Sequence, residues 1–82
     1  MLDPRLVETL SRILNVAASS VSPTTSPSTV SSWDSVAHIN LILELEDVFG
    51  IRFPTEAIPK LDSAARLQEE IDALRGSAQP GR

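Results

Sequence analysis

Apolar residues recur at spacings of three and four along the first part of the chain, a pattern typical of an amphipathic helix. Asp3 and Pro4 precede this stretch and suit a helix start, because an aspartate side chain caps free amides and a proline fits the first turn. We therefore expect a helix from about Pro4 to about Val16. Its apolar face is formed by Leu6, Val7, Leu10, Ile13 and Leu14.

A second, longer helix is expected to begin at Asp34 or Ser35 and to end at Gly50, since glycine commonly terminates helices. Its apolar positions cover more than half of the helix circumference, so we expect this helix at the centre of a bundle. These positions are Val36, Ile39, Leu41, Ile42, Leu43, Leu45, Val48 and Phe49.

The last part of the chain contains one weak element and one strong element. Residues 55–61 fit a single helical turn, because Pro59 removes an amide that a longer helix would use. A final helix is expected from about Ser63, a capping candidate, to a stop at Gly76. Residues 77–82 are expected to form a disordered C-terminal tail.

Residues 18–32, between the first two helices, are mostly Ser, Thr and Pro and follow neither the helical nor the strand period. Pro23 and Pro27 argue against a helix here. Loops of this length in a compact domain are usually either functional or disordered. Both outcomes stay open, because Val21 and Val30 offer apolar side chains that would hold the loop against the core.

Together these elements predict an all-α fold in one domain over residues 1–76, a small bundle of three main helices plus one short helical turn. The 82 residues include no cysteine and one histidine, which excludes disulfides and Cys-based or His-rich metal sites. A net charge of −4 argues against nonspecific nucleic-acid binding and favours partners with basic patches. Neither a transmembrane span nor a secretion signal is recognisable, so we expect a cytoplasmic monomer that does not insert into membranes.

Ser35 stands at the expected start of the second helix, and two interpretations of it follow. In the first, Ser35 or Asp34 only caps the helix, and the chain is a non-catalytic helical adaptor. In the second, Ser35 carries a phosphate ester, which the free amides and the positive end of the helix dipole favour. A serine hydrolase is not expected, because no Gly-x-Ser-x-Gly motif is present and His38 is poorly placed to reach Ser35. We expect His38 to be exposed and Trp33 to anchor the preceding loop.

Residues 33–53, WDSVAHINLILELEDVFGIRF, resemble the attachment site and second helix of acyl carrier proteins. The mark of that family is Asp-Ser-Leu, with the serine esterified to 4′-phosphopantetheine from coenzyme A, and this chain has Asp34, Ser35 and Val36. The resemblance implies that Ser35 carries the arm and that Asp34 helps a phosphopantetheinyl transferase and its magnesium engage the site. It covers roughly residues 33–74 well, and the first helix by pattern only.

The resemblance also implies roles for residues beyond the attachment site. Val36 and Ile39 would meet apolar patches on partner enzymes, with core packing as the alternative. Glu46 and Asp47 match acidic positions that the family presents to basic patches, with a solvated helix face as the alternative. Asn40 also belongs to the expected partner-binding set and stands where carriers of fatty-acid synthesis commonly have an acid. A cargo pocket, with ordinary core packing as the alternative, would be lined by Ile42, Leu45, Phe53, Ile58, Leu61 and Leu67.

The resemblance implies a carrier that tethers acyl or aminoacyl groups as thioesters and delivers them to partner enzymes. Its arm would supply the thiol that the cysteine-free chain lacks. The implied partners are a phosphopantetheinyl transferase and acyl-loading and acyl-transfer enzymes with basic patches. Because the second helix starts with fewer acids than in general fatty-acid carriers, a specialised pathway is favoured over housekeeping fatty-acid synthesis. The chain itself is not expected to be an enzyme.

Overall fold

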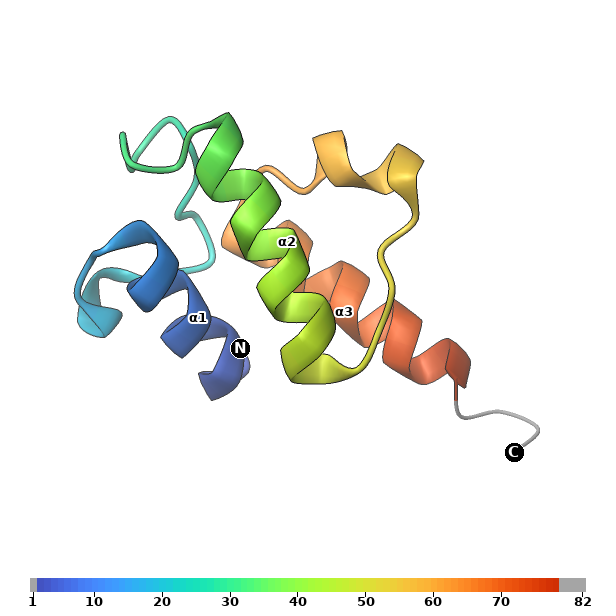
Figure 1. The fold of residues 1–82 in the computed structure, drawn as a ribbon. Helices are drawn as coiled ribbons and strands as arrows, with labels where there is room; N and C mark the ends of the chain where they lie inside the picture. The colour runs from blue at the N-terminus through green and yellow to red at the C-terminus, as the bar shows by residue number, and fades with distance from the viewer. Residues whose placement is uncertain (1, 79–82) are drawn as a thin grey trace.

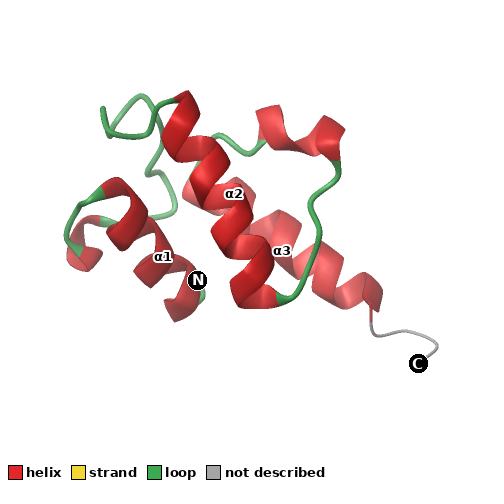
Figure 2. Cartoon of the chain, in the orientation of Figure 1, coloured by secondary structure: helices red, strands yellow, loops and turns green. Residues whose placement is uncertain are grey.

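The computed structural model describes residues 2–78, and within them the chain is helical with no strand (Figure 2). Three long helices run through the molecule, with α2 in the middle of the view in Figure 1 and α3 behind it. This confirms the predicted all-α bundle of three main helices. Two short 3-10 helices complete it, one more than the sequence indicated. In chain order the elements are α1 (Pro4–Leu14), η1 (Ala18–Ser20), α2 (Ser35–Phe49), η2 (Thr55–Lys60) and α3 (Ala64–Ala78).

Both ends of helix α1 are set by residues next to them in the sequence. The Asp3 carboxylate accepts a hydrogen bond from the Arg5 amide at 2.8 Å, and Pro4 occupies the first turn. Asn15 adopts the left-handed conformation with φ of 58° and closes the last turn through its N–H to the Ser11 carbonyl. The helix therefore ends at Leu14, slightly before the expected Val16.

Helix α2 matches its predicted bounds. Asp34 caps its start, and Gly50, with φ of 64°, closes its end in the left-handed region where glycine carries no steric penalty. One face of the helix is buried through Leu41, Ile42 and Leu45. The opposite face leaves apolar side chains exposed, so the wide apolar stripe of this helix is not wholly a core surface.

Helix α3 departs from the prediction at its C-terminal end. The sequence indicated a stop at Gly76, but the helix continues to Ala78. A glycine inside a helix costs only about 1 kcal/mol relative to alanine, so it permits a stop without requiring one. The expectation of a disordered tail over 77–82 is therefore wrong for residues 77 and 78, and residues 79–82 lie outside the described part of the chain.

The core is built from one apolar row on each main helix, together with side chains from the connecting segments. Its fully or nearly fully buried members are Leu6, Leu10, Leu14, Trp33, Leu41, Ile42, Leu45, Phe53, Leu61, Ala64, Leu67 and Ile71. Because all three rows are needed to enclose this cluster, the position of α2, and of Ser35 at its start, is fixed by packing along its whole length.

The three helices also meet through charged and aromatic side chains at the end of α2 opposite Ser35. The guanidinium of Arg5 lies 4.5 Å from the centre of the Phe49 ring, and that of Arg75 lies 5.6 Å from it. Asp3 links the same region to α3, because its N–H donates to the Gln68 side-chain oxygen at 2.6 Å. This arrangement joins the start of α1 and the end of α2 to α3.

No helix in residues 2–78 is long and apolar enough to cross a membrane.

Candidate functional site

Ser35 is the first residue of α2 and is exposed. The capping function at this helix start belongs to its neighbour, since the Asp34 Oδ1 accepts the Ala37 N–H at 2.9 Å. Within residues 2–78 no group forms a hydrogen bond with the Ser35 hydroxyl. The hydroxyl is thus free, solvent-facing and located at the positive end of the helix dipole. A free hydroxyl at this place suits covalent attachment of an anionic group better than it suits capping.

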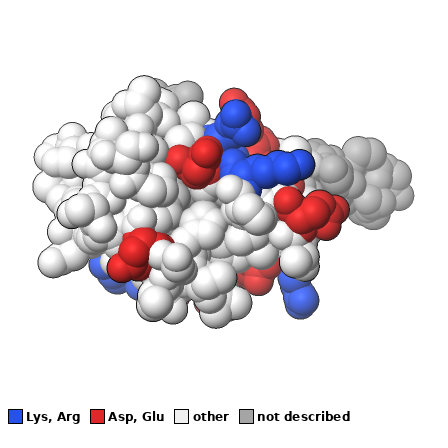
Figure 3. All heavy atoms as spheres, turned by 90° about the horizontal axis from the view of Figure 1, so that it is seen from above, with Lys and Arg blue, Asp and Glu red and all other residues white. Residues whose placement is uncertain are grey.

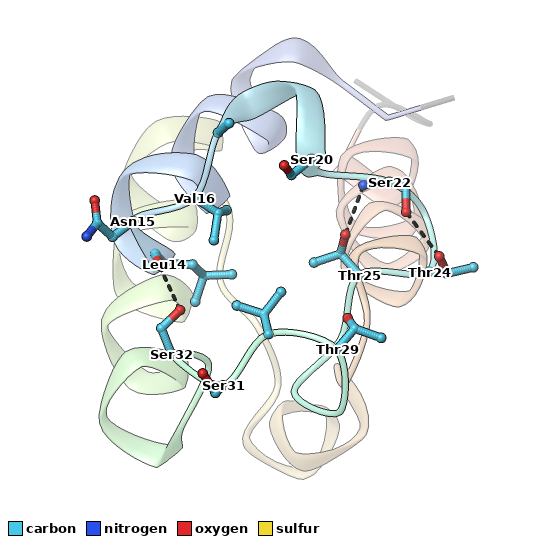
Figure 4. Close-up of a pocket in the computed structure, with 12 residues that line it drawn as sticks. Leu14, Asn15, Val16, Ser20, Ser22, Thr24, Thr25, Thr29, Ser31 and Ser32 are labelled. Carbon is cyan, nitrogen blue, oxygen red and sulfur yellow. Dashed lines mark hydrogen bonds between the residues drawn. The ribbon is translucent and has the colours of Figure 1, made fainter.

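The loop before α2 is ordered by its own hydroxyl groups and backbone. Its turns are closed by short bonds such as the one from the Ser22 amide to the Thr25 hydroxyl at 2.9 Å. The Ser32 hydroxyl donates to the Leu14 carbonyl at 2.7 Å and so ties the end of the loop to the end of α1. These residues line a cavity of about 680 Å³. Figure 4 shows how they are arranged around it. The question that composition left open is thereby answered in favour of an ordered loop.

The same loop is joined to the start of α3. The Thr25 carbonyl accepts the Ala64 N–H at 2.9 Å, and the Pro23 carbonyl accepts the Ala65 N–H at 3.0 Å. Val21 and Val30 are half-buried against the core, in the role that the sequence analysis considered for them. The loop therefore forms a fixed support for the residues that lead into Ser35.

Trp33 is buried, with 3% of its surface exposed, and anchors the loop as predicted. Its indole N–H donates to the Nδ1 of His38 at 3.0 Å, and the Nε2 of His38 lies 2.9 Å from the Ile58 carbonyl. The prediction of an exposed His38 is wrong. Its ring is half-buried because both nitrogens have partners inside the molecule.

A groove of about 560 Å³ opens directly beside Ser35. Its walls are largely apolar, with carboxylates present at Asp34 and Asp62. The groove is lined by Pro27, Trp33, Asp34, Ser35, His38, Ile39, Ile58, Pro59 and Asp62. Sequence reasoning missed Pro27, Pro59 and Asp62, which come from segments whose approach to α2 has no local signal.

The apolar residues proposed for partner binding are exposed. Val36 has 70% and Ile39 has 52% of its surface accessible, and Asn40 is exposed beside them. Leu43 extends the same face with 60% exposure and was not among the predicted positions. The signal was available, because Leu43 lies four residues after Ile39 and seven after Val36, spacings that share one face of a helix.

The two acidic residues proposed for partner binding differ in their surroundings. The Glu46 carboxylate is half-buried and accepts the Phe53 N–H at 2.9 Å, which holds the connector after α2. Asp47 is exposed and has no hydrogen-bond or ion-pair partner among the described residues. Glu44 forms an ion pair with Arg12, in which the Arg12 Nη2 and the Glu44 Oε2 are 2.9 Å apart. Of these three acids on α2, Asp47 is the one left free for an external cation.

The proposed cargo-pocket residues lie mostly in the packed core. Ile42, Leu45, Phe53, Leu61 and Leu67 all belong to the buried cluster. Ile58 is half-buried and is the member of this set that lines the groove beside Ser35.

Charge is distributed unevenly around the site. No Asp, Glu, Lys or Arg occurs between Arg12 and Asp34, and none between Asp34 and Glu44. In the view from above, Figure 3 shows a broad uncharged area on the left, while most charged side chains gather toward the right. Asp34 is thus the one charged residue in the sequence from 13 to 43, and the carboxylate of Asp62 joins it at the groove beside Ser35. No group of His, Asp and Glu able to hold a metal ion occurs within residues 2–78.

Comparisons with known proteins identify a relative by sequence and similar solved structures. No family model matches the chain. A protein described as "probable acyl carrier protein" from Caulobacter vibrioides is 40% identical over 45 residues, which is 55% of this chain and 52% of that protein. The match thus spans about half the length of the relative.

The fold has a counterpart among solved structures. The solution structure of holo acyl carrier protein from Geobacter metallireducens superposes with a TM-score of 0.82 at 23% identity, covering 95% of this chain and 90% of that one. This chain therefore has the same fold as that acyl carrier protein.

Proposed function

We propose that this chain is an acyl carrier protein that bears 4′-phosphopantetheine on the Ser35 hydroxyl. The observation that carries the proposal is the division of tasks at the start of α2, where Asp34 caps the helix and leaves the Ser35 hydroxyl exposed and unbonded. The alternative of an adaptor in which Ser35 is only a cap loses its physical reason, because the cap is Asp34.

The residues around Ser35 fit such a group. An exposed hydroxyl admits a transferase, and the amide-rich end of α2 favours the negative charge of a phosphodiester. The apolar groove beside Ser35 offers a surface along which an attached chain can lie. Once bound, the group supplies a terminal thiol for thioester formation, and the chain's own residues hold and present it without turning over a substrate.

The partners in this proposal are a phosphopantetheinyl transferase and enzymes that load and receive acyl groups. Exposed Val36, Ile39 and Asn40 support a contact next to Ser35 that is apolar and neutral. Asp47 and Glu56 are exposed acids that support engagement of basic patches farther from the attachment site. The absence of charged residues from 35 to 43, in the first part of α2, also supports a specialised acyl or aminoacyl pathway. A monomer and a cytoplasmic location stay predictions.

The cargo pocket among the core residues stays a proposal with a structural cost. Any acyl chain that reached Leu45 or Leu67 would have to displace side chains that are fully buried. The groove with Ile58 at its wall requires no such displacement, which supports a short or externally held cargo.

The test is intact mass after incubation with coenzyme A, magnesium and a promiscuous phosphopantetheinyl transferase. We expect the native chain to gain one phosphopantetheine, Ser35→Ala to gain none, and Ser31→Ala, which removes another exposed hydroxyl, to gain one as the native chain does. A known carrier protein in the same reaction controls for transferase activity. If that control is modified and the native chain is not, the carrier proposal fails and the adaptor interpretation replaces it.

A further inference from the structure

The imidazole of His38 connects two parts of the molecule that border the groove beside Ser35. On one side, its Nδ1 accepts the indole N–H of Trp33 at 3.0 Å. On the other side, its Nε2 lies 2.9 Å from the Ile58 carbonyl in η2. The two rings lie nearly parallel, with an interplanar angle of 25° and centroids 6.1 Å apart. A continuous hydrogen-bonded chain thus runs from the buried tryptophan through α2 to η2.

This chain of bonds requires one protonation state of His38. The indole nitrogen only donates, so Nδ1 must carry a free lone pair. The carbonyl only accepts, so Nε2 must carry the hydrogen. Only the neutral imidazole with hydrogen on Nε2 meets both demands. Protonation of Nδ1 would place two N–H groups against each other and break the bond to Trp33.

Segment 54–62 depends on His38 for its polar attachment to the bundle. Within residues 2–78, the His38 bond to the Ile58 carbonyl is the hydrogen bond that links this segment to another element. The other bonds of the segment are local, such as the Leu61 N–H to the same carbonyl at 3.2 Å. The short helix η2 also has no side-chain cap. Apolar contacts of Ile58 and Leu61 hold the segment in place, but they do not fix its orientation in the way a hydrogen bond does.

We propose that His38 is a positioning residue that holds η2 against the start of α2 and thereby sets the width of the groove beside Ser35. With both hydrogen bonds of His38 in place, the groove has the lining and volume described above. When the bonds of His38 are lost, η2 moves away from α2 and the groove widens toward the core. This inference rests on the proposed function. For a group carried on Ser35, His38 controls how far that group enters the protein.

Other titratable groups near the groove are carboxylates or lie outside it. The carboxylates of Asp34 and Asp62 line the groove. Glu56 and Lys60 are exposed on η2, and the loop packed against Trp33 carries no charged residue. Within residues 2–78 His38 forms no ion pair with these carboxylates, and its contacts with Trp33 and Ile58 are hydrogen bonds.

The test uses the full chain with unmodified Ser35 and follows the indole N–H signal of Trp33, the only tryptophan, by NMR. We expect His38→Phe to shift this signal and to lower the protection of the indole N–H from solvent exchange roughly fivefold. His38→Gln should keep both near native values, because its amide offers one acceptor and one donor as the neutral imidazole does.

If His38→Phe leaves the indole signal and its exchange protection unchanged, or if His38→Gln alters them as much as His38→Phe does, the positioning role is overturned. Because Ser35 is unmodified throughout, that failure is distinct from a failure of the carrier proposal, which would appear as absence of modification at Ser35.

Discussion

At the start of α2, one residue caps the helix and its neighbour presents a free hydroxyl. The Asp34 carboxylate satisfies the Ala37 amide, and the Ser35 hydroxyl is left without an internal bond. A capping aspartate is worth about 1 kcal/mol of stability, whereas a serine that neither caps nor packs is worth little. We therefore expect Asp34 to contribute to the stability of the fold, and Ser35 to be available for modification without loss of stability.

Substitutions of Asp34 test this separation. Asp34→Ala should lower the free energy of unfolding by about 1 kcal/mol, because the Ala37 amide loses its acceptor. Asp34→Asn should stay within about 0.5 kcal/mol of the native chain, because it keeps a capping oxygen while losing the charge. Urea denaturation measures both. If Asp34 also engages the transferase through its charge, both variants slow the modification of Ser35. Equal stabilities of the Ala and Asn variants would contradict the capping role.

At the scale of a whole element, α2 has one apolar side that packs and one that faces solvent. Leu45 is fully buried, while Leu43, two residues earlier, is 60% exposed. Because both positions are leucine, the spacing of apolar residues predicts a single wide apolar stripe that faces the core. The difference between the two faces comes from what covers them, which is decided by α1, α3 and the connectors.

The two faces predict opposite responses to mutation. Leu45→Ala should cost about 2–5 kcal/mol of stability, because it leaves a cavity in a close-packed cluster. Leu43→Gln should change stability by less than about 0.5 kcal/mol, because its side chain is already largely in water. Thermal or urea unfolding of both variants makes the comparison. A large loss for Leu43→Gln would show that this face is covered in solution, and would remove its availability to partners.

Helix positions and caps could be predicted from the sequence because their signals are local. Asp3, Asp34 and Gly50 each act within a turn of their own position. The environment of His38 could not be predicted, since its partner Ile58 lies 20 residues away and contributes a backbone carbonyl, which any residue has. The order of the loop escaped prediction for the same reason, because its ties to α3 are made by main-chain atoms. The stop at Gly76 was overestimated because glycine permits a helix end without enforcing it.

At the scale of the whole molecule, ion pairs connect α1 and α3 at the end of the bundle opposite Ser35. Asp3 forms an ion pair with Arg5 at 3.3 Å and approaches Arg75 of α3 at 3.8 Å. The hydrogen bond from the Arg5 side chain, assisted by its backbone amide and by the charges of Arg5 and Arg75, lowers the pKa of the Asp3 carboxyl below its ordinary value of 3.8. The charged form of Asp3 is therefore favoured in the folded state.

This pKa shift has a defined sign in the pH dependence of stability. A carboxyl with a lowered folded-state pKa stabilises the fold above its ordinary value of 3.8, and this contribution is lost as the pH falls through the folded-state value. Asp3→Asn should thus be less stable than the native chain near neutral pH, and the difference should shrink in acid below the ordinary pKa. Unfolding curves of both chains across this range measure it. A difference that grows toward low pH would contradict the assignment.

The contacts between the loop and α3 have a consequence for how the chain can be cut or redesigned. The first amides of α3 find acceptors in the carbonyls of Pro23 and Thr25, which precede α2 in the chain. The loop over 18–32, which has the composition of a flexible spacer, thus supplies the acceptors that a preceding helical turn would otherwise give to the first amides of α3. A peptide containing α3 alone would lack these acceptors, and a shortened loop would unwind α3 from its start instead of simply drawing α1 and α2 together.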